Sequence, residues 1–200
     1  MNKFIWGLDL STTNVGLALW DIEGNLIELK HLELKVDKKI NPDERYIYKA
    51  NIFKEYVLNF QERLKEDYDG TLENIIIEEP LGGSNNLKTV TMLAEFNGIC
   101  RYIMYEIFDI KPVKITVNES RKLFLPEYVT QKKVKGKLKD VLSMPKDVDK
   151  KHLIWEKVKN LYPSIEWVYD KKGNPKKMCY DMSDSIVVSI GGLKLLGYID

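Results

Sequence analysis

The strongest constraint on the fold is a run of three consecutive isoleucines, Ile75 to Ile77, which is followed by two glutamates and Pro80. Three β-branched residues in succession favour a strand, and a strand without a polar face must be covered on both sides. The run therefore predicts a central strand in a sheet with helices on both faces. The 200 residues are 44% hydrophobic, enough for one such core, so we predict a single domain over residues 1–200.

The segment before this run predicts three strands and a helix. Residues 3–10 are mostly apolar, residues 15–21 follow a Ser-Thr-Thr-Asn turn, and residues 26–34 alternate apolar and polar side chains after a Glu-Gly-Asn turn. Short turns between strands predict an antiparallel meander. Apolar residues then recur at helical spacing over 43–67, which predicts a helix covering one sheet face.

After the isoleucine run, the pattern alternates between helix and strand. We predict a long helix over 87–108, a short strand over 112–117 and a short helix over 118–125. Two further helices are predicted over 149–161 and 182–196, and the segment between them contains a Lys-Lys-Gly-Asn-Pro turn that suggests a small hairpin. This order of elements predicts an α/β fold with a mixed sheet and helices on both faces.

Positive charge is concentrated in the second half of the chain. The net charge of +1 would alone argue against a nucleic-acid partner. However, residues 111–151 contain 12 lysines and arginines against 5 acidic residues, an excess of +7, whereas residues 1–110 carry −7. The weakly periodic, lysine-rich stretch near 126–147 is predicted to be a loop or mobile insertion. The asymmetry favours a basic surface for a polyanion, with a solvated loop that has no partner as the alternative.

Four carboxylates stand in unexpected positions. Asp9 lies inside an apolar strand, and Glu78 ends the isoleucine strand. Asp181 and Asp184 are three residues apart at the predicted start of the last helix, so both project from one face of its first turn. If the strands of Asp9 and Glu78 are neighbours and this helix docks at their ends, the four acids converge. Such an oxygen-only ligand set selects Mg²⁺ or Mn²⁺ over zinc, and two such ions can drive phosphodiester hydrolysis.

Each acid also has a purely structural interpretation. Asp9 could cap the turn at 11–13, and Glu78 could be an ordinary charge at a strand end. Asp181 could be the N-cap of the last helix, with Asp184 stabilising the helix dipole. Their positions on the first strand, the isoleucine strand and the last helix favour the shared metal site.

Three motifs resemble those of the RuvC-type Holliday junction resolvases. They are Gly-Leu-Asp-Leu-Ser-Thr-Thr-Asn-Val-Gly (7–16), Ile-Ile-Ile-Glu-Glu-Pro (75–80) and the Asp-x-x-Asp helix at 181–190. The resemblance implies an RNase H-like fold, whose five-stranded sheet has the order 3-2-1-4-5, with an antiparallel meander continued by two parallel strands. It also implies a Mg²⁺-dependent endonuclease, with Mn²⁺ as a substitute, that acts as a homodimer and nicks four-way DNA junctions in recombination and repair.

The resemblance also implies roles for individual residues. It assigns metal binding and catalysis to Asp9, Glu78, Asp181 and Asp184. Family members place lysines ahead of the penultimate helix near the scissile phosphate, which matches Lys150 as a DNA contact and Lys151 as a catalytic residue. Other expected DNA contacts lie in the loop before the 87–108 helix and in the basic insertion, where helix capping and ordinary surface charge are the alternatives: Ser84, Asn85, Lys132, Lys133 and Lys135.

Two further expectations concern positions specific to this chain. Bacterial members have a stacking aromatic three residues after the second-motif acid, whereas this chain has Leu81. The 87–108 helix is mostly a core element by its pattern, but Phe96 or Tyr102 could contribute to a dimer interface.

Three rival functions and several exclusions complete the sequence-based expectations. The first motif also resembles the phosphate-binding hairpin of actin-like ATPases and sugar kinases, but 200 residues supply one RNase H-like lobe rather than two, so no nucleotide cofactor is expected. The other rivals are a non-catalytic junction-binding protein and a nuclease for other branched DNA or RNA–DNA hybrids. No signal peptide or long apolar span is visible, and Cys100 and Cys179 are not clustered. We therefore expect a cytoplasmic protein, in a bacterium or phage-infected host, without membrane contact, disulfide or zinc.

Overall fold

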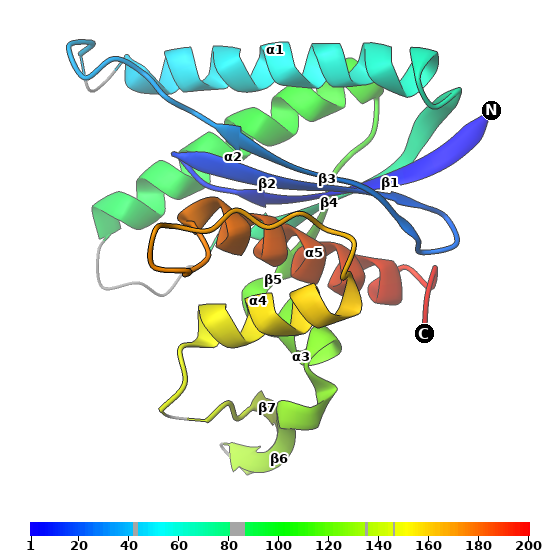
Figure 1. Ribbon diagram of the computed structural model, residues 1–200, viewed down its shortest axis with the longest axis vertical. Coiled ribbons are helices and arrows are strands. Elements are labelled where there is room, and N and C mark those ends of the chain that lie inside the picture. The colour runs from blue at the N-terminus through cyan, green and yellow to red at the C-terminus, as the bar shows by residue number, and fades with distance from the viewer. Residues whose placement is uncertain (42–43, 81–86, 135, 146) are drawn as a thin grey trace.

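A five-stranded mixed sheet forms the centre of the molecule (Figure 1). The computed structural model describes residues 1–41, 44–80, 87–134, 136–145 and 147–200. The strands lie in the order β3-β2-β1-β4-β5, in which β2 is antiparallel to β1 and β3, and β4 is parallel to β1 and β5. This topology confirms the predicted order. The strands are β1 (Asn2–Leu10), β2 (Asn14–Asp21), β3 (Leu26–Glu33), β4 (Gly70–Glu79) and β5 (Val113–Thr116).

Helices cover both faces of the sheet, as Figure 1 shows. One face packs against α1 (Arg45–Glu66) and α2 (Leu87–Phe108), and the other against α5 (Lys177–Leu195), with α3 (Val117–Phe124) and α4 (Lys150–Leu161) outside it. The isoleucines of β4 divide between these layers. Ile75 and Ile77 lie in the core under α1 and α2, whereas Ile76 lies in the core under α5. Successive positions along a strand face opposite layers, and both layers are buried here, so all three positions carry an apolar residue.

Two glycines allow α5 to lie directly on the sheet. A Cβ atom at Gly7 would overlap the side chain of Ser189, and one at Gly16 would overlap the main-chain carbonyl of Asp181. Gly16 pairs with Asp9 across β1 and β2. The bare strand surface beside Asp9 therefore admits the acid-bearing turn of α5.

The last helix begins earlier than the sequence pattern predicts. α5 begins at Lys177, with Lys176 as its N-cap, so Asp181 and Asp184 lie in the second turn rather than the first. The predicted hairpin before it is reduced to a turn closed by a single bridge between Tyr169 and Pro175. The N-cap interpretation of Asp181 is therefore wrong, because Asp181 is one full turn inside the helix.

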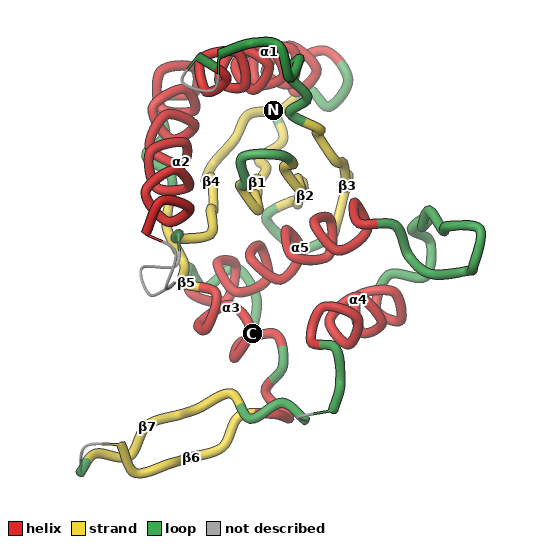
Figure 2. The backbone as a smooth tube through the Cα atoms, turned by 90° about the vertical axis from the view of Figure 1, so that its left-hand side faces the viewer, coloured by secondary structure: helices red, strands yellow, loops and turns green. Residues whose placement is uncertain are grey.

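The basic insertion is folded, not a loop. After a 3₁₀ turn at Pro126–Tyr128, the strands β6 (Val129–Val134) and β7 (Lys137–Leu142) form an antiparallel two-stranded ribbon. Gly136, with φ +80°, lies in the turn between them. Figure 2 shows the ribbon extending away from the sheet and its helices. Lysines interrupt the apolar residues on both strands, so the alternation that identifies a strand is hidden in the sequence.

The exposed face of α2 differs in part from the prediction. Phe96 is 0% exposed and belongs to the core, so it cannot contribute to a dimer interface, whereas Tyr102 is 64% exposed.

The residue Leu81 lies outside the described part of the chain. No helix within the described ranges combines the length and apolar character needed to cross a bilayer.

Candidate active site

One row of cross-strand neighbours places two acids on the α5 face of the sheet. Leu8 pairs with Ile77 in the parallel β1–β4 ladder, so Asp9 and Glu78 are the next residues at the carboxyl ends of these strands. Asp9 pairs with Gly16, and Gly16 pairs with His31 on β3. Residues paired in this way share a face, and Asp9 has the same parity as Ile5, which packs under α5. The row therefore runs Glu78, Asp9, Gly16, His31.

The two acids of α5 complete a cluster over this row. Asp181 and Asp184 are 7% and 8% exposed. Burial, followed by the negative charges of Glu78, Asp184 and Asp181, raises the pKa of Asp9 well above its usual range. Asp9 therefore lies close enough to the other three carboxylates for their negative charges to act on it. Their convergence on one metal site stays a prediction.

Glu78 is also perturbed by its surroundings. Burial, and then the charge of Asp184, raises the pKa of Glu78 to about 7, although Arg121 and Lys151 oppose this rise. The neighbouring acid behaves differently, because Glu79 points to an ion pair with Lys114 at 2.6 Å. Glu78 rather than Glu79 is thus the member of the cluster, and it is more than an ordinary strand-end charge.

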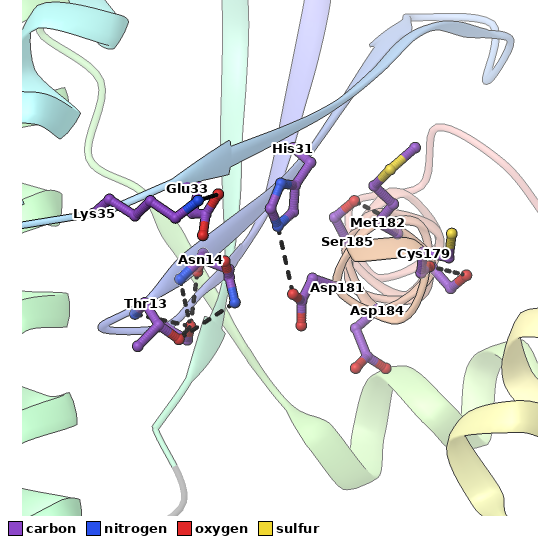
Figure 3. A network of polar contacts seen from close by, with 12 residues as sticks. Thr13, Asn14, His31, Glu33, Lys35, Cys179, Asp181, Met182, Asp184 and Ser185 are labelled. Carbon is purple, nitrogen blue, oxygen red and sulfur yellow. Dashed lines mark hydrogen bonds and ion pairs between the residues drawn. The ribbon is translucent and has the colours of Figure 1, made fainter. Parts of the chain in front are cut away.

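The acids of α5 face different basic partners. Figure 3 shows Asp181 directed at His31, whose Nε2 lies 3.5 Å from Asp181 Oδ2. Asp184 instead lies 3.5 Å from Lys151 Nζ and 3.7 Å from an Arg121 guanidinium nitrogen. Burial raises the pKa of Asp184, while Lys151 and Arg121 lower it. Lys151 therefore lies beside Asp184.

His31 and Arg121 are functional candidates that sequence reasoning missed. His31 lies within an alternating edge strand, and Arg121 lies in a short helix, so neither has a local sequence signal. Their positions follow from the strand register and from the packing of α3 against α5. Only the fold could have revealed them.

The chemistry of the cluster fits a hard divalent cation. Four carboxylates supply oxygen ligands only, and Asp181 Oδ2 is buried with no hydrogen-bond partner in the described structure. No group of three or more His, Cys, Asp or Glu side chains among the described residues is arranged around a common point that could hold a metal. Asp181 is directed to His31, and Asp184 is directed to Lys151 and Arg121.

The remaining predicted residues have varied positions. Lys150 is the first, exposed residue of α4, whose N-cap Asp149 accepts hydrogen bonds from the main chain of Lys151 and His152. Lys132 and Lys133 are exposed on β6. The turn after β1 is closed by Ser11 Oγ, which accepts from the main chain of Thr13 and Asn14, so Asp9 is not its cap. Ser84, Asn85 and Lys135 lie outside the described residues.

Comparisons with known proteins identify the fold. No protein-family model matches the sequence, and no curated protein matches it. Among solved structures, Thermus thermophilus RuvC in complex with a Holliday junction substrate matches with a TM-score of 0.59 and 10% identity, over 98% of this chain and 96% of that one. The chain has the RuvC fold.

Two further structures support the same assignment. Another Thermus thermophilus RuvC structure matches with a TM-score of 0.54 and 13% identity, over 97% of this chain and 96% of that one. The yeast mitochondrial Holliday junction resolvase Ydc2 gives a TM-score of 0.51 and 9% identity, over 97% of this chain and 79% of that one. The RuvC fold thus extends over nearly the whole chain, which confirms the RNase H-like prediction.

Proposed function

We propose that this protein is a metal-dependent endodeoxyribonuclease that cuts four-way DNA junctions. The observation that carries this proposal is the convergence of Asp9, Glu78, Asp181 and Asp184, from three distant segments, at one edge of a RuvC-fold sheet. The structural matches support a branched-DNA substrate, because one is a RuvC complex with a Holliday junction and another is a junction resolvase.

The four carboxylates are the proposed ligands for Mg²⁺, for which Mn²⁺ can substitute. When bound, such ions activate water and stabilise the leaving oxygen of the cleaved phosphodiester. The cations beside Asp184 have a second role in this proposal. Lys151 and Arg121 would neutralise charge on the scissile phosphate once the carboxylate binds a metal instead of them.

The lysine ribbon is proposed to bind one duplex arm of the DNA junction. Lys132 lies directly opposite Lys139, and Lys137 lies opposite Val134, so three lysines share one face of the ribbon. Like charges directly opposite one another are unfavourable, and a phosphate backbone along this face would relieve them. Lys133 shares the other face with Asp140. Each six-residue strand spans about 20 Å, comparable with about six base pairs of a DNA arm.

The other DNA contacts expected from the sequence stay part of the proposal. Lys150 extends the positive charge of Lys151 along the first turn of α4. Ser84 and Asn85 precede the first turn of α2, where main-chain N–H groups favour phosphate contact. Lys135 lies outside the described residues and stays a proposed contact by its place in the basic segment of the sequence.

A homodimer is proposed through the exposed face of α2. Tyr102 and Tyr105 are 64% and 50% exposed, and Ile99 lies on the same side of the helix. Exposed aromatic side chains in this number favour a protein interface. Light scattering on the wild type and on Tyr102→Glu tests this, because the variant should shift the protein towards monomer.

A cleavage assay separates the proposed function from its rivals. Labelled four-way junctions, flaps, linear duplex and RNA–DNA hybrids are incubated with the protein in Mg²⁺, Mn²⁺ or Ca²⁺. We expect paired nicks in the junction with Mg²⁺ and Mn²⁺ and none with Ca²⁺. Binding without nicking in any of these ions would identify a non-catalytic junction-binding protein. Preferential cutting of flaps or hybrids would assign another substrate, and tight ATP binding would support the kinase-like rival.

A further inference from the structure

A groove of about 870 Å³ opens on the β3 side of the carboxylates. Its walls come from the turn after β1, the end of β3 and the segment after it, α1, and the start of α5. His31 lines this groove and also contacts Asp181, so the groove adjoins the candidate active site. Figure 3 shows Thr13, Asn14 and Lys35 on this side of His31.

The lining of the groove is strongly positive. Five cationic side chains face one acid, Glu33, which pairs with Lys35 at 2.8 Å. Two of the other cations have neutral partners, since the Arg45 guanidinium and the Lys49 ammonium donate to main-chain carbonyls. Their charge is therefore not cancelled. The cationic residues are Lys35, Arg45, Lys49, Lys176 and Lys177.

The start of α5 adds to this positive charge. Lys176 is the N-cap and makes no side-chain capping bond, Lys177 is the first helical residue, and the first turn contains no acid. Both lysines are exposed, and neither has an ion-pair or hydrogen-bond partner for its side chain in the described part of the chain. Lysines at the positive end of a helix dipole are unfavourable. An anion in the groove would compensate the lysines and the helix end together.

The composition of the lining indicates which anion fits. No Phe, Tyr or Trp lines the groove within the described chain, so stacking on bases has little support. The cations come from three segments, with Lys35 after β3, Arg45 and Lys49 on α1, and Lys176 and Lys177 at the start of α5. This arrangement suits successive phosphates of a polyanion, with Thr13 and Asn14 as neutral polar neighbours.

We infer that this groove binds the sugar–phosphate backbone of the DNA strand that crosses the carboxylates, with Lys176 and Lys177 as its principal contacts. The inference rests on the proposed function. It identifies the groove as the surface along which the substrate strand reaches the carboxylates. It assigns the start of α5 a role in binding that is separate from the acids one turn further along.

The test compares two double variants of the full chain that remove equal charge. Lys176→Gln/Lys177→Gln alters the groove, and Lys171→Gln/Lys172→Gln alters exposed lysines in the preceding turn that do not line it. Binding of a labelled four-way junction is measured in Ca²⁺ over a range of salt concentrations. We expect the groove variant to lose about tenfold in affinity and to reduce the salt slope by about 2, with the control close to the wild type.

Equal losses in both variants, or no loss in the groove variant, would overturn the inference. Thermal melting verifies that both variants are folded. Junctions carrying single neutral methylphosphonates sharpen the test. One substitution next to the cut site should weaken the wild type but not the groove variant, and equal sensitivity of the two proteins at every position would contradict a groove contact. If the wild type binds the junction in Ca²⁺ but never cleaves in Mg²⁺, the nuclease proposal fails and the groove inference is still tested.

Discussion

The central sheet and the lysine ribbon are both made of β-strands, but they differ in what holds them. Every strand of the sheet belongs to a layer between helices, and β1 and β4 bury apolar side chains on both faces. The ribbon pairs only with itself, and most of its described side chains are exposed, including Leu138 at 71%. The sheet and the α5 helix packed on it can therefore hold the four carboxylates in fixed positions, whereas the ribbon can only present charge.

The difference predicts separate roles for the two regions. Changes in the sheet and in α5 should alter cleavage and stability, because they act on a packed site. Changes in the ribbon should alter affinity for DNA and its salt dependence, while the free energy of unfolding stays nearly constant.

The largest effect is expected from the acids themselves. Asp9→Asn and Asp184→Asn should each lower the junction cleavage rate by about 10³-fold or more, because a metal ligand is lost. Junction affinity in Ca²⁺ should change by less than about threefold, a small fraction of its free energy. Glu79→Gln is the matched control, since Glu79 pairs with Lys114 outside the cluster. Cleavage by both Asn variants at the wild-type rate would remove the acids from catalysis.

The next effect concerns the contact between α5 and the sheet. Gly16→Val should destabilise the protein by about 3 kcal/mol, because its side chain would overlap the Asp181 carbonyl, and cleavage should fall as α5 is displaced. Gly98→Ala on α2 is the control. Nothing lies within 4 Å of a Cβ there, so helix propensity should raise stability by about 0.5–1 kcal/mol. Denaturant titration measures both, and a Gly16→Val variant as stable as the wild type would contradict the packing.

A smaller effect is expected on the ribbon. Lys132→Gln/Lys137→Gln/Lys139→Gln should weaken junction binding and reduce the salt slope by about 3, one for each phosphate contact. The melting temperature should stay within about 2 °C of the wild type, corresponding to less than about 1 kcal/mol. Lys133→Gln, on the opposite face, serves as the control. If Lys133→Gln lowers the slope as much per lysine as the triple variant, the ribbon has no binding face.

The last effect is a pH-dependent loss of wild-type stability relative to Glu78→Gln. The pKa of Glu78 is about 7 in the folded protein, above its ordinary value of 4.5. Ionising this side chain therefore costs more free energy in the folded state than in the unfolded state. Wild-type stability is therefore lost, relative to Glu78→Gln, as pH rises from 4.5 to about 7. In EDTA, the variant should melt with the wild type near pH 4 and about 7–14 °C above it at pH 8, because the difference between the two pKa values corresponds to about 3 kcal/mol. An unchanged difference across this range would contradict the shift.

The same contrast explains what could be predicted from the sequence. The strands of the sheet were predictable because burial on one or both faces leaves an apolar pattern, as in residues 75–77. Asp9 and Glu78 stood out because they interrupt such a pattern. The ribbon buries little, so its lysines carry no periodic signal, and its fold depends on a turn at Gly136 and on pairing.

Two parts of the site depended on information that local sequence does not hold. His31 joins the acids only because β3 pairs with β2 in one register, which places His31 beside Gly16. The start of α5 was predicted five residues late, because Lys177 to Tyr180 lack the apolar repeat of the later turns. Long-range packing, which draws α5 onto Gly7 and Gly16, determines both.

The central claim is that folding gathers four carboxylates into one site for divalent cations. A crystal structure of the wild type soaked with Mn²⁺, with anomalous data, tests it most directly. We expect anomalous peaks between the carboxylates of Asp9, Glu78, Asp181 and Asp184, with Asp184 turned away from Lys151. Mn²⁺ bound elsewhere, with the Asp184–Lys151 ion pair intact at saturating metal, would contradict the account.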